Sequence, residues 1–128
     1  MSALSDYLEN EILDHILGTG AYTMPTNVYV GLSTGSFVDD NSGTELSGSG
    51  YARKVASFGA ASSGTASNDA AIEFPAATGS WGTVSHFGIF DASTSGNLLI
   101  HGALTSSKVI ESGDILKVAV GDMDITAA

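Results

Sequence analysis

The chain has 128 residues, a length that fits one domain with its own hydrophobic core, and we treat residues 1–128 as a single domain. Hydrophobic residues make up 43%, charged residues only 14%, Cys is absent, and 14 Asp and Glu outnumber 4 Lys and Arg, for a formal net charge of −10. This composition excludes disulfide and thiolate chemistry, and so few basic residues cannot neutralise phosphates, so we expect neither nucleic acid nor an anionic membrane as a partner.

The first predicted element is an amphipathic helix over residues 4–17, within an N-terminal segment 1–18. Ser5 or Ser2 precedes the apolar stripe as a possible N-cap, and Gly18 ends it. The stripe either packs on the domain's own sheet or docks on a neighbouring subunit. In the second case, the interface residues are Leu4, Tyr7, Leu8, Ile12, Leu13 and Ile16.

Beyond Gly18 the apolar period changes to two, which predicts β-strands within residues 26–128. Turn-forming residues separate these strands, which favours an all-β fold: an antiparallel β-sandwich or jelly-roll-like domain of about eight strands behind one N-terminal helix. Residues 34–50 and 59–69 are rich in Gly and Ser and are expected to be loops. The predicted strands are 28–33, 51–58, 70–74, 84–90, 98–104, 108–110, 115–121 and 123–126.

One hairpin is predicted around the turn-forming segment 91–96. If Asp91 pairs with Gly96, His86 lies opposite His101 on the neighbouring strand. Two imidazoles on one face could serve as metal ligands. A zinc site needs three or four ligands, however, and no Cys, Asp or Glu shares that predicted face, so we predict no metal.

A second hairpin is predicted to turn at Ser112-Gly113. Its register sets Lys108 opposite Lys117. Like charges in this position destabilise a strand pair unless water or carboxylates surround them.

The segment Gly31-Leu-Ser-Thr-Gly35 matches G-x-S-x-G, the pattern of a hydrolase nucleophile elbow. That motif needs a helix directly after the turn and a parallel sheet beneath it. A loop follows Gly35 and no parallel α/β units are predicted, so we do not assign Ser33 as a nucleophile.

Two further features have structural explanations. Asp39-Asp40-Asn41 resembles a fragment of a calcium loop but lacks the distant bidentate Glu, so it is read as a flexible acidic loop. Trp81 could stack on a sugar, but a buried plug at one end of the sandwich is the favoured interpretation. No catalytic, cofactor-binding or metal-ligating residue is therefore predicted.

Several segments, spread over nearly the whole chain, carry a resemblance to a known family. They include YLENEILDHILG at 7–18, VYVGL at 28–32, GYAR at 50–53, FP at 74–75, WGTVSHFGIFD at 81–91, GNLL at 96–99, GALT at 102–105 and SGD at 112–114. On these residues the chain resembles small structural proteins of tailed bacteriophages, which carry tail-fibre or head-decoration labels. The resemblance implies a virion component without catalysis, and it does not distinguish head from tail.

The sequence has no heptad or collagen-like repeat from which a long fibre shaft could be built. We therefore favour a capsid decoration (cement) protein, a homo-oligomer and by lattice symmetry a trimer, with the major capsid protein as partner and no cofactor. No secretory signal is recognised, so assembly is expected in the host cytoplasm and the final location in the virion. The alternatives are a tail, baseplate or tail-fibre accessory protein, and a carbohydrate-binding module. For the latter, the stacking residues would be Trp81, Tyr22, Tyr29 or Tyr51.

Overall fold

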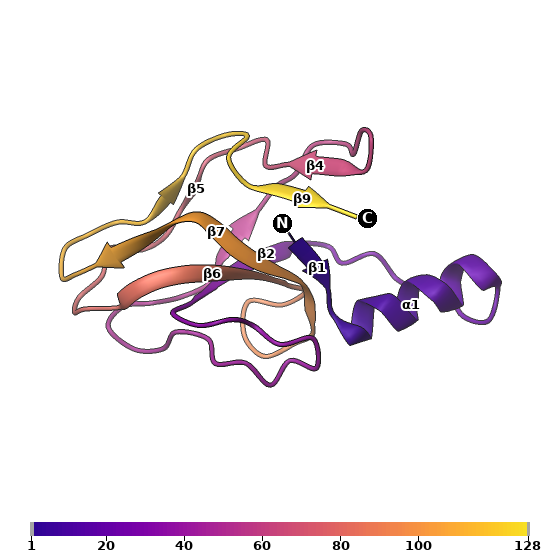
Figure 1. Cartoon of the computed structure of the whole chain (residues 1–128), viewed down its shortest axis with the longest axis horizontal. Coiled ribbons are helices and arrows are strands. Elements are labelled where there is room, and N and C mark those ends of the chain that lie inside the picture. The colour runs from indigo at the N-terminus through magenta and orange to yellow at the C-terminus, as the bar shows by residue number, and fades with distance from the viewer. Residues whose placement is uncertain (1, 128) are drawn as a thin grey trace.

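The computed structural model describes residues 2–127 and contains nine strands and one helix in that range. A five-stranded antiparallel sheet has the order β1-β7-β6-β2-β3, and two-stranded sheets β4-β9 and β5-β8 lie above it (Figure 1). The predicted all-β class with one N-terminal helix is confirmed. The bounds are β1 Ser2–Leu4, α1 Asp6–Leu17, β2 Val28–Ser33, β3 Lys54–Ala56, β4 Thr65–Ser67, β5 Ile72–Glu73, β6 Gly82–Phe90, β7 Leu98–Ile110, β8 Lys117–Val118 and β9 Asp124–Thr126.

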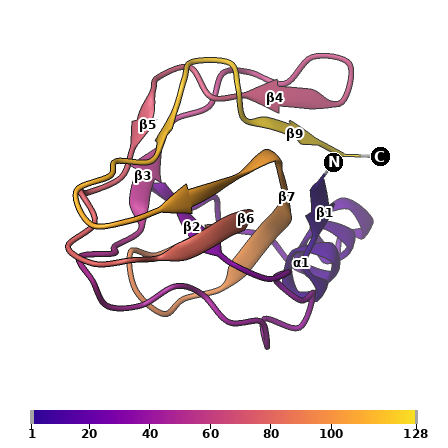
Figure 2. The same ribbon diagram turned by 60° about the vertical axis from the view of Figure 1, so that its left-hand side comes forward.

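The main core lies between the large sheet and the layer formed by the two small ones (Figure 2). Val30 and Leu32 of β2 and Phe87 and Ile89 of β6 enter the core at alternate positions, as the period of two predicted. Val84 of β6 is also in the core but lies three residues before Phe87, across an irregularity of the strand. Ile72 and Phe74 come from the opposite side, and Leu116 and Met123 close the layer between the short strands. A second, smaller cluster of Phe37, Phe90 and Leu98 lies on the other face of the large sheet.

The helix begins two residues later than predicted. Ser5 is its N-cap and accepts a hydrogen bond from Leu8 N at 3.2 Å, while Gly18 ends it with φ 81. The preceding residues form β1, in which Leu4 lies opposite Ile100 of β7. Periodicity alone could not separate Leu4 from the helix, because its spacing from Leu8 also fits a helical turn. Leu4 is in a strand because the backbone of β7 pairs with residues 2–4.

The hairpin of β6 and β7 is present, but the predicted register was wrong. Gly88 lies opposite His101, and His86 lies opposite Ala103. Phe90 pairs with Leu98 and not with Asn97, and the irregularity between Ile89 and Phe90 moves the pairing by one residue more. The two histidines are therefore not cross-strand partners. Bulges of this kind leave no trace in the apolar pattern.

The second predicted hairpin does not form, although the turn is where it was expected. Gly113 has φ 89, and Asp114 N donates to Glu111 O at 2.9 Å. The chain then leaves β7, and β8 pairs with β5, which places Lys117 opposite Glu73 while Lys108 lies opposite Val84. An opposite-charge pair replaces the predicted like-charge pair, which is the favourable arrangement across strands.

Other strand boundaries also differ from prediction. The predicted strands 98–104 and 108–110 are parts of one continuous β7, and the predicted strand 51–58 shortens to β3. The expected loop 59–69 contains β4, which pairs with β9. Asn68, which is buried, fixes this corner by donating to Ala70 O and Ala119 O, both at 2.9 Å.

Candidate interaction site

Helix α1 projects from the end of the sheet, with its tip away from the strands (Figure 1). The chain turns back against the last turn, where Tyr22 N donates to His15 Nδ1 at 3.2 Å. Leu8 near its start is 7% exposed, but exposure rises along the helix. Ile12 is 37% exposed, Leu13 56%, Ile16 71% and Leu17 72%. We call these four residues the α1 ridge. The ridge is an apolar surface without a partner among residues 2–127.

The start of α1 is firmly attached to the sheet. Ser5 Oγ donates to Leu98 O at 2.5 Å, and Ser5 N donates to Leu99 O at 2.8 Å. Asp6 N also donates to Asp39 O of the 34–50 loop at 3.0 Å. The sequence prediction left two roles open for the helix, and the structure divides them: Leu8 packs on the domain, whereas the ridge faces solvent.

Of the six interface residues predicted from sequence, Leu8 is buried in the chain's own fold. Leu4 is half-buried in β1, and Tyr7 is 36% exposed. Ile12, Leu13 and Ile16 remain exposed and available to a partner. Leu17 was not among the predicted interface residues and is as exposed as Ile16.

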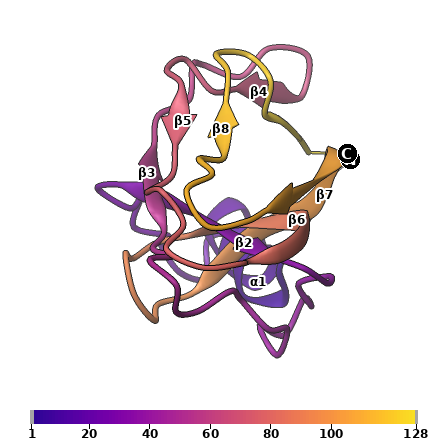
Figure 3. The ribbon, with the colours of Figure 1, turned by 90° about the vertical axis from the view of Figure 1, so that its left-hand side faces the viewer.

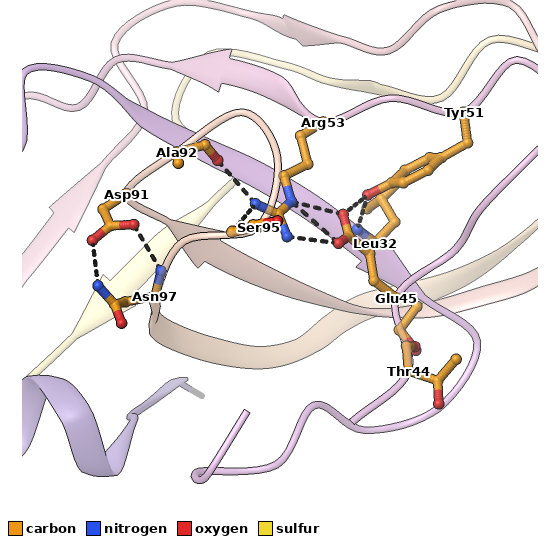
Figure 4. Close-up of polar contacts among 10 residues, drawn as sticks. Leu32, Thr44, Glu45, Tyr51, Arg53, Asp91, Ala92, Ser95 and Asn97 are labelled. Carbon is orange, nitrogen blue, oxygen red and sulfur yellow. Dashed lines mark hydrogen bonds and ion pairs between the residues drawn. The ribbon is translucent and has the colours of Figure 1, made fainter. Parts of the chain in front are cut away.

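The second notable cluster is a polar network inside the fold (Figure 4). Arg53 forms a two-pronged ion pair with Glu45, with Nη2 and Oε1 2.8 Å apart and Nε and Oε2 2.9 Å apart. The Arg53 side chain is only 8% exposed, and its guanidinium carbon lies 3.5 Å from the centre of the Phe90 ring. Arg53 Nη1 also donates to Ala92 O and Ser95 O, so one side chain connects the 34–50 loop with the 91–97 turn.

Tyr51 extends this network into the sheet. Its hydroxyl donates to Glu45 Oε2 at 2.5 Å and accepts from Leu32 N at 2.9 Å. Burial, together with the hydrogen bond and the charge of Glu45, raises the pKa of Tyr51 well above its ordinary value of 10.0. Gly31 makes room for the carboxylate, because a Cβ there would lie 2.6 Å from Glu45 Oε2. All these groups are satisfied internally, so the network stabilises the fold.

Residues 3–126 match the family model described as Podophage GP4 fiber I protein gp80. The chain belongs to this family. It is therefore a structural protein of a bacteriophage fibre family and a virion component, as the resemblance implied. No curated protein matches the chain. Within residues 2–127, no helix is long and apolar enough to cross a membrane.

In this fibre-family protein, the hydrogen bonds of the Ser33 hydroxyl within residues 2–127 go to backbone groups, although Ser33 lies opposite His86 in the β2–β6 pair. It is buried, its Oγ donates to Thr44 O at 2.6 Å, and it accepts from Gly35 N at 3.0 Å. Its hydroxyl therefore shapes the 34–50 loop. The G-x-S-x-G match reflects this turn and the space that Gly31 leaves for Glu45.

The structure separates the predicted metal candidates. His101 Nε2 lies 2.5 Å from Asp39 Oδ1, whereas His86 bonds Ser36 and Ser85. Asp40 accepts from Ser42 N at 2.9 Å, and its hydrogen bonds from Ser42 lower its pKa. Over residues 2–127, no three His, Asp or Glu side chains are grouped to hold a metal ion.

Trp81 is the plug that the favoured interpretation described. It is 6% exposed, its Nε1 donates to Ser49 O at 2.9 Å, and it meets Tyr51 edge-on with ring centres 5.5 Å apart. Neither ring is free to stack on a sugar, which removes two of the four stacking residues considered for a carbohydrate-binding module.

Sequence reasoning missed the Glu45–Arg53 pair. Tyr51 and Arg53 lie two residues apart in a segment predicted to be a strand, a spacing that places side chains on one face. Glu45 lies in a loop with no period, and no sequence signal brings it beneath them.

Proposed function

We propose that this protein is a non-enzymatic module of the phage fibre apparatus that joins neighbouring virion proteins through the α1 ridge. The observation that carries the proposal is the increase in exposure of apolar side chains along α1, from 7% at Leu8 to 72% at Leu17. Family membership favours a fibre location over the capsid-decoration role that the sequence analysis preferred.

The exposed ridge has a physical cost unless a partner covers it. Full burial of one large aliphatic side chain lowers the free energy by about 1.5–3 kcal/mol relative to its exposure to water. A 12-residue helix is also marginally stable in water without packing along its length. Docking the ridge therefore stabilises both the helix and the assembly, which is the behaviour expected of an attachment element.

The polar groups support a structural role. Glu45, Arg53 and Tyr51 form the most buried charged cluster described above, and its hydrogen-bonding groups are engaged within the fold. Ser33 and His86 likewise bond to neighbouring loop and strand residues. We infer that the chain performs no catalysis and that its activity consists of binding other proteins.

Antibody labelling of intact virions, combined with a copy count by quantitative mass spectrometry, tests this function. We expect label on the tail fibres and a low copy number per particle. Label spread over the head in many copies would contradict the fibre location and favour capsid decoration. An antibody against a tail protein of known position serves as the control for particle integrity.

A further inference from the structure

A groove lies between β7 and the segment that carries β8 and leads into β9. It has a volume of about 560 Å³, and Phe87, Leu116 and Met123 contribute to its apolar floor. We call it the β7–β8 groove. In Figure 3, which faces the end of the molecule opposite α1, β7 and β8 flank this region and α1 lies behind the sheet. The groove and the tip of α1 therefore lie at different ends of the protein.

The groove contains two of the chain's four basic residues, Lys108 and Lys117. Neither forms an ion pair within 4.0 Å among residues 2–127, whereas Arg53 is bound to Glu45. Asp122 and Asp124 line the end of the groove towards β9, where Asp124 accepts a hydrogen bond from Ser67. Glu73 also lies opposite Lys117 across the β5–β8 pair, so carboxylates balance the charge of the groove as a whole. In a chain of net charge −10, two exposed lysines in one groove are nevertheless an unusual local concentration of basic side chains.

The tip of α1 has the complementary properties. It presents Ile16 and Leu17, and Glu11 and Asp14 are the carboxylates nearest to them in the helix, whereas Asp6 and Glu9 lie in the first turn at the sheet. His15 is the only basic residue of the helix. The C-terminal end of a helix also has a partial negative charge that favours nearby ammonium groups. An apolar tip with nearby carboxylates matches a polar groove that has an apolar floor and two lysines.

We propose that the α1 tip of one copy inserts into the β7–β8 groove of a second copy. This inference rests on the proposed role of α1 as the attachment element and names its partner. Ile16 and Leu17 cover the apolar floor, while Lys108 and Lys117 face the carboxylates and the end of the helix. The alternative, pairing of two α1 helices, would bring their acids together with no lysine or arginine on either helix to offset them.

This contact joins two different surfaces at different ends of the molecule. Such a heterologous contact repeats from copy to copy and produces an open filament or a closed ring. A module without heptad or collagen-like repeats can in this way form an elongated assembly. The inference thus explains how a short chain contributes to a fibre.

Complementary variants in solution test the proposal. Ile16→Asp/Leu17→Asp disables the tip, and Lys108→Glu/Lys117→Glu disables the groove; all four positions are exposed. In sedimentation velocity, wild type is expected to associate with rising concentration, and each variant alone to lose association at least roughly 100-fold. An equimolar mixture should form a heterodimer, in which the intact tip of the groove variant occupies the intact groove of the tip variant. This heterodimer should grow no further, because the two surfaces that stay free are the disabled ones.

Three outcomes would overturn the proposal: a wild type that stays monomeric at every concentration, a groove variant that still associates like wild type, or a mixture that forms no heterodimer. Lys54→Glu on β3 is the matched charge control and should associate like wild type. Thr105→Trp fills the groove without changing charge and replaces the double lysine variant if circular dichroism shows that variant to be unfolded. Virion labelling measures location independently, so failure here would leave the fibre location standing.

Discussion

In most proteins charged side chains are exposed and large apolar side chains are buried. The Glu45–Arg53–Tyr51 network departs from this rule by burying charges, and the α1 ridge departs from it by exposing apolar side chains. The network buries charges: the Arg53 side chain is 8% exposed, yet the chain itself provides its partners. The ridge exposes apolar groups, and Leu17 at 72% exposure has no cover from the chain. The groups of the network find all their partners within one molecule, whereas the apolar side chains of the ridge are covered only when another protein binds. Substitutions should therefore separate folding from assembly.

The largest expected effect on stability is that of Arg53→Ala. It removes the ion pair with Glu45, the contact with the Phe90 ring and the bonds to Ala92 O and Ser95 O. The half-buried Glu45 carboxylate then keeps only the hydrogen bond from Tyr51 and has no cation beside it. Allowing for the 22% exposure of Glu45, the free energy of unfolding should fall by about 2–4 kcal/mol in urea denaturation. Lys54→Ala at the next, exposed position should change it by less than about 0.5 kcal/mol. Equal effects of the two variants would show that the network does not stabilise the fold.

Tyr51→Phe should have the next largest effect. The ring remains, but the buried Leu32 N loses its acceptor and Glu45 loses a donor. A loss of about 1–3 kcal/mol is expected by the same measurement at neutral pH. Tyr29→Phe, a tyrosine for which the structure shows no hydroxyl bond within residues 2–127, is the control and should be nearly neutral.

The raised pKa of Tyr51 adds a pH dependence with a definite sign. The folded state retains the hydroxyl proton while the unfolded chain releases it near pH 10.0, so alkaline pH favours unfolding. The contribution is fully present below pH about 10 and is lost as the pH rises further. The stability difference between wild type and Tyr51→Phe should therefore shrink above that pH. A difference that stays constant up to pH 11 would contradict the buried hydroxyl.

Ser5→Ala tests the junction between the two regions. The substitution removes the N-cap bond to Leu8 N and the donor to Leu98 O, and it should cost about 1–2 kcal/mol. Helical circular dichroism should fall as well, because α1 is then less firmly attached. Ser107→Ala, at an exposed site on β7, is the matched control. An unchanged helix signal would mean that packing of Leu8 alone holds α1.

The smallest effect on stability is expected for Ile16→Ser/Leu17→Ser. Both side chains are more than two-thirds exposed, so the free energy of unfolding should change by less than about 0.5 kcal/mol per site. Assembly onto the virion, followed by the amount of protein that sediments with purified particles, should nevertheless decrease. A clear loss of stability in the isolated protein would show that the ridge belongs to its own core and would remove the contrast drawn above.

The sequence determined the elements that depend on local periodicity and special residues. The helix, its Gly18 end, the alternating strands β2 and β6 and the turn at Gly113 follow from the apolar period and from the conformations that these residues favour. The sequence left the N-cap open between Ser5 and Ser2, and the structure selects Ser5. The net charge of −10 is likewise a property of the chain whatever its fold, and the expectation that neither nucleic acid nor an anionic membrane is a partner rests on it alone.

Only the tertiary structure decided which strands pair and which polar groups meet. The turn and one irregularity shifted β7 so that His86 and His101 are not partners, and β8 pairs with β5 instead of β7. Glu45 reaches Arg53 from a loop, and Leu17 is exposed because α1 extends beyond the sheet. These outcomes depend on contacts between residues distant in the chain, whose energies compete across the whole fold and are not encoded in any short window of sequence.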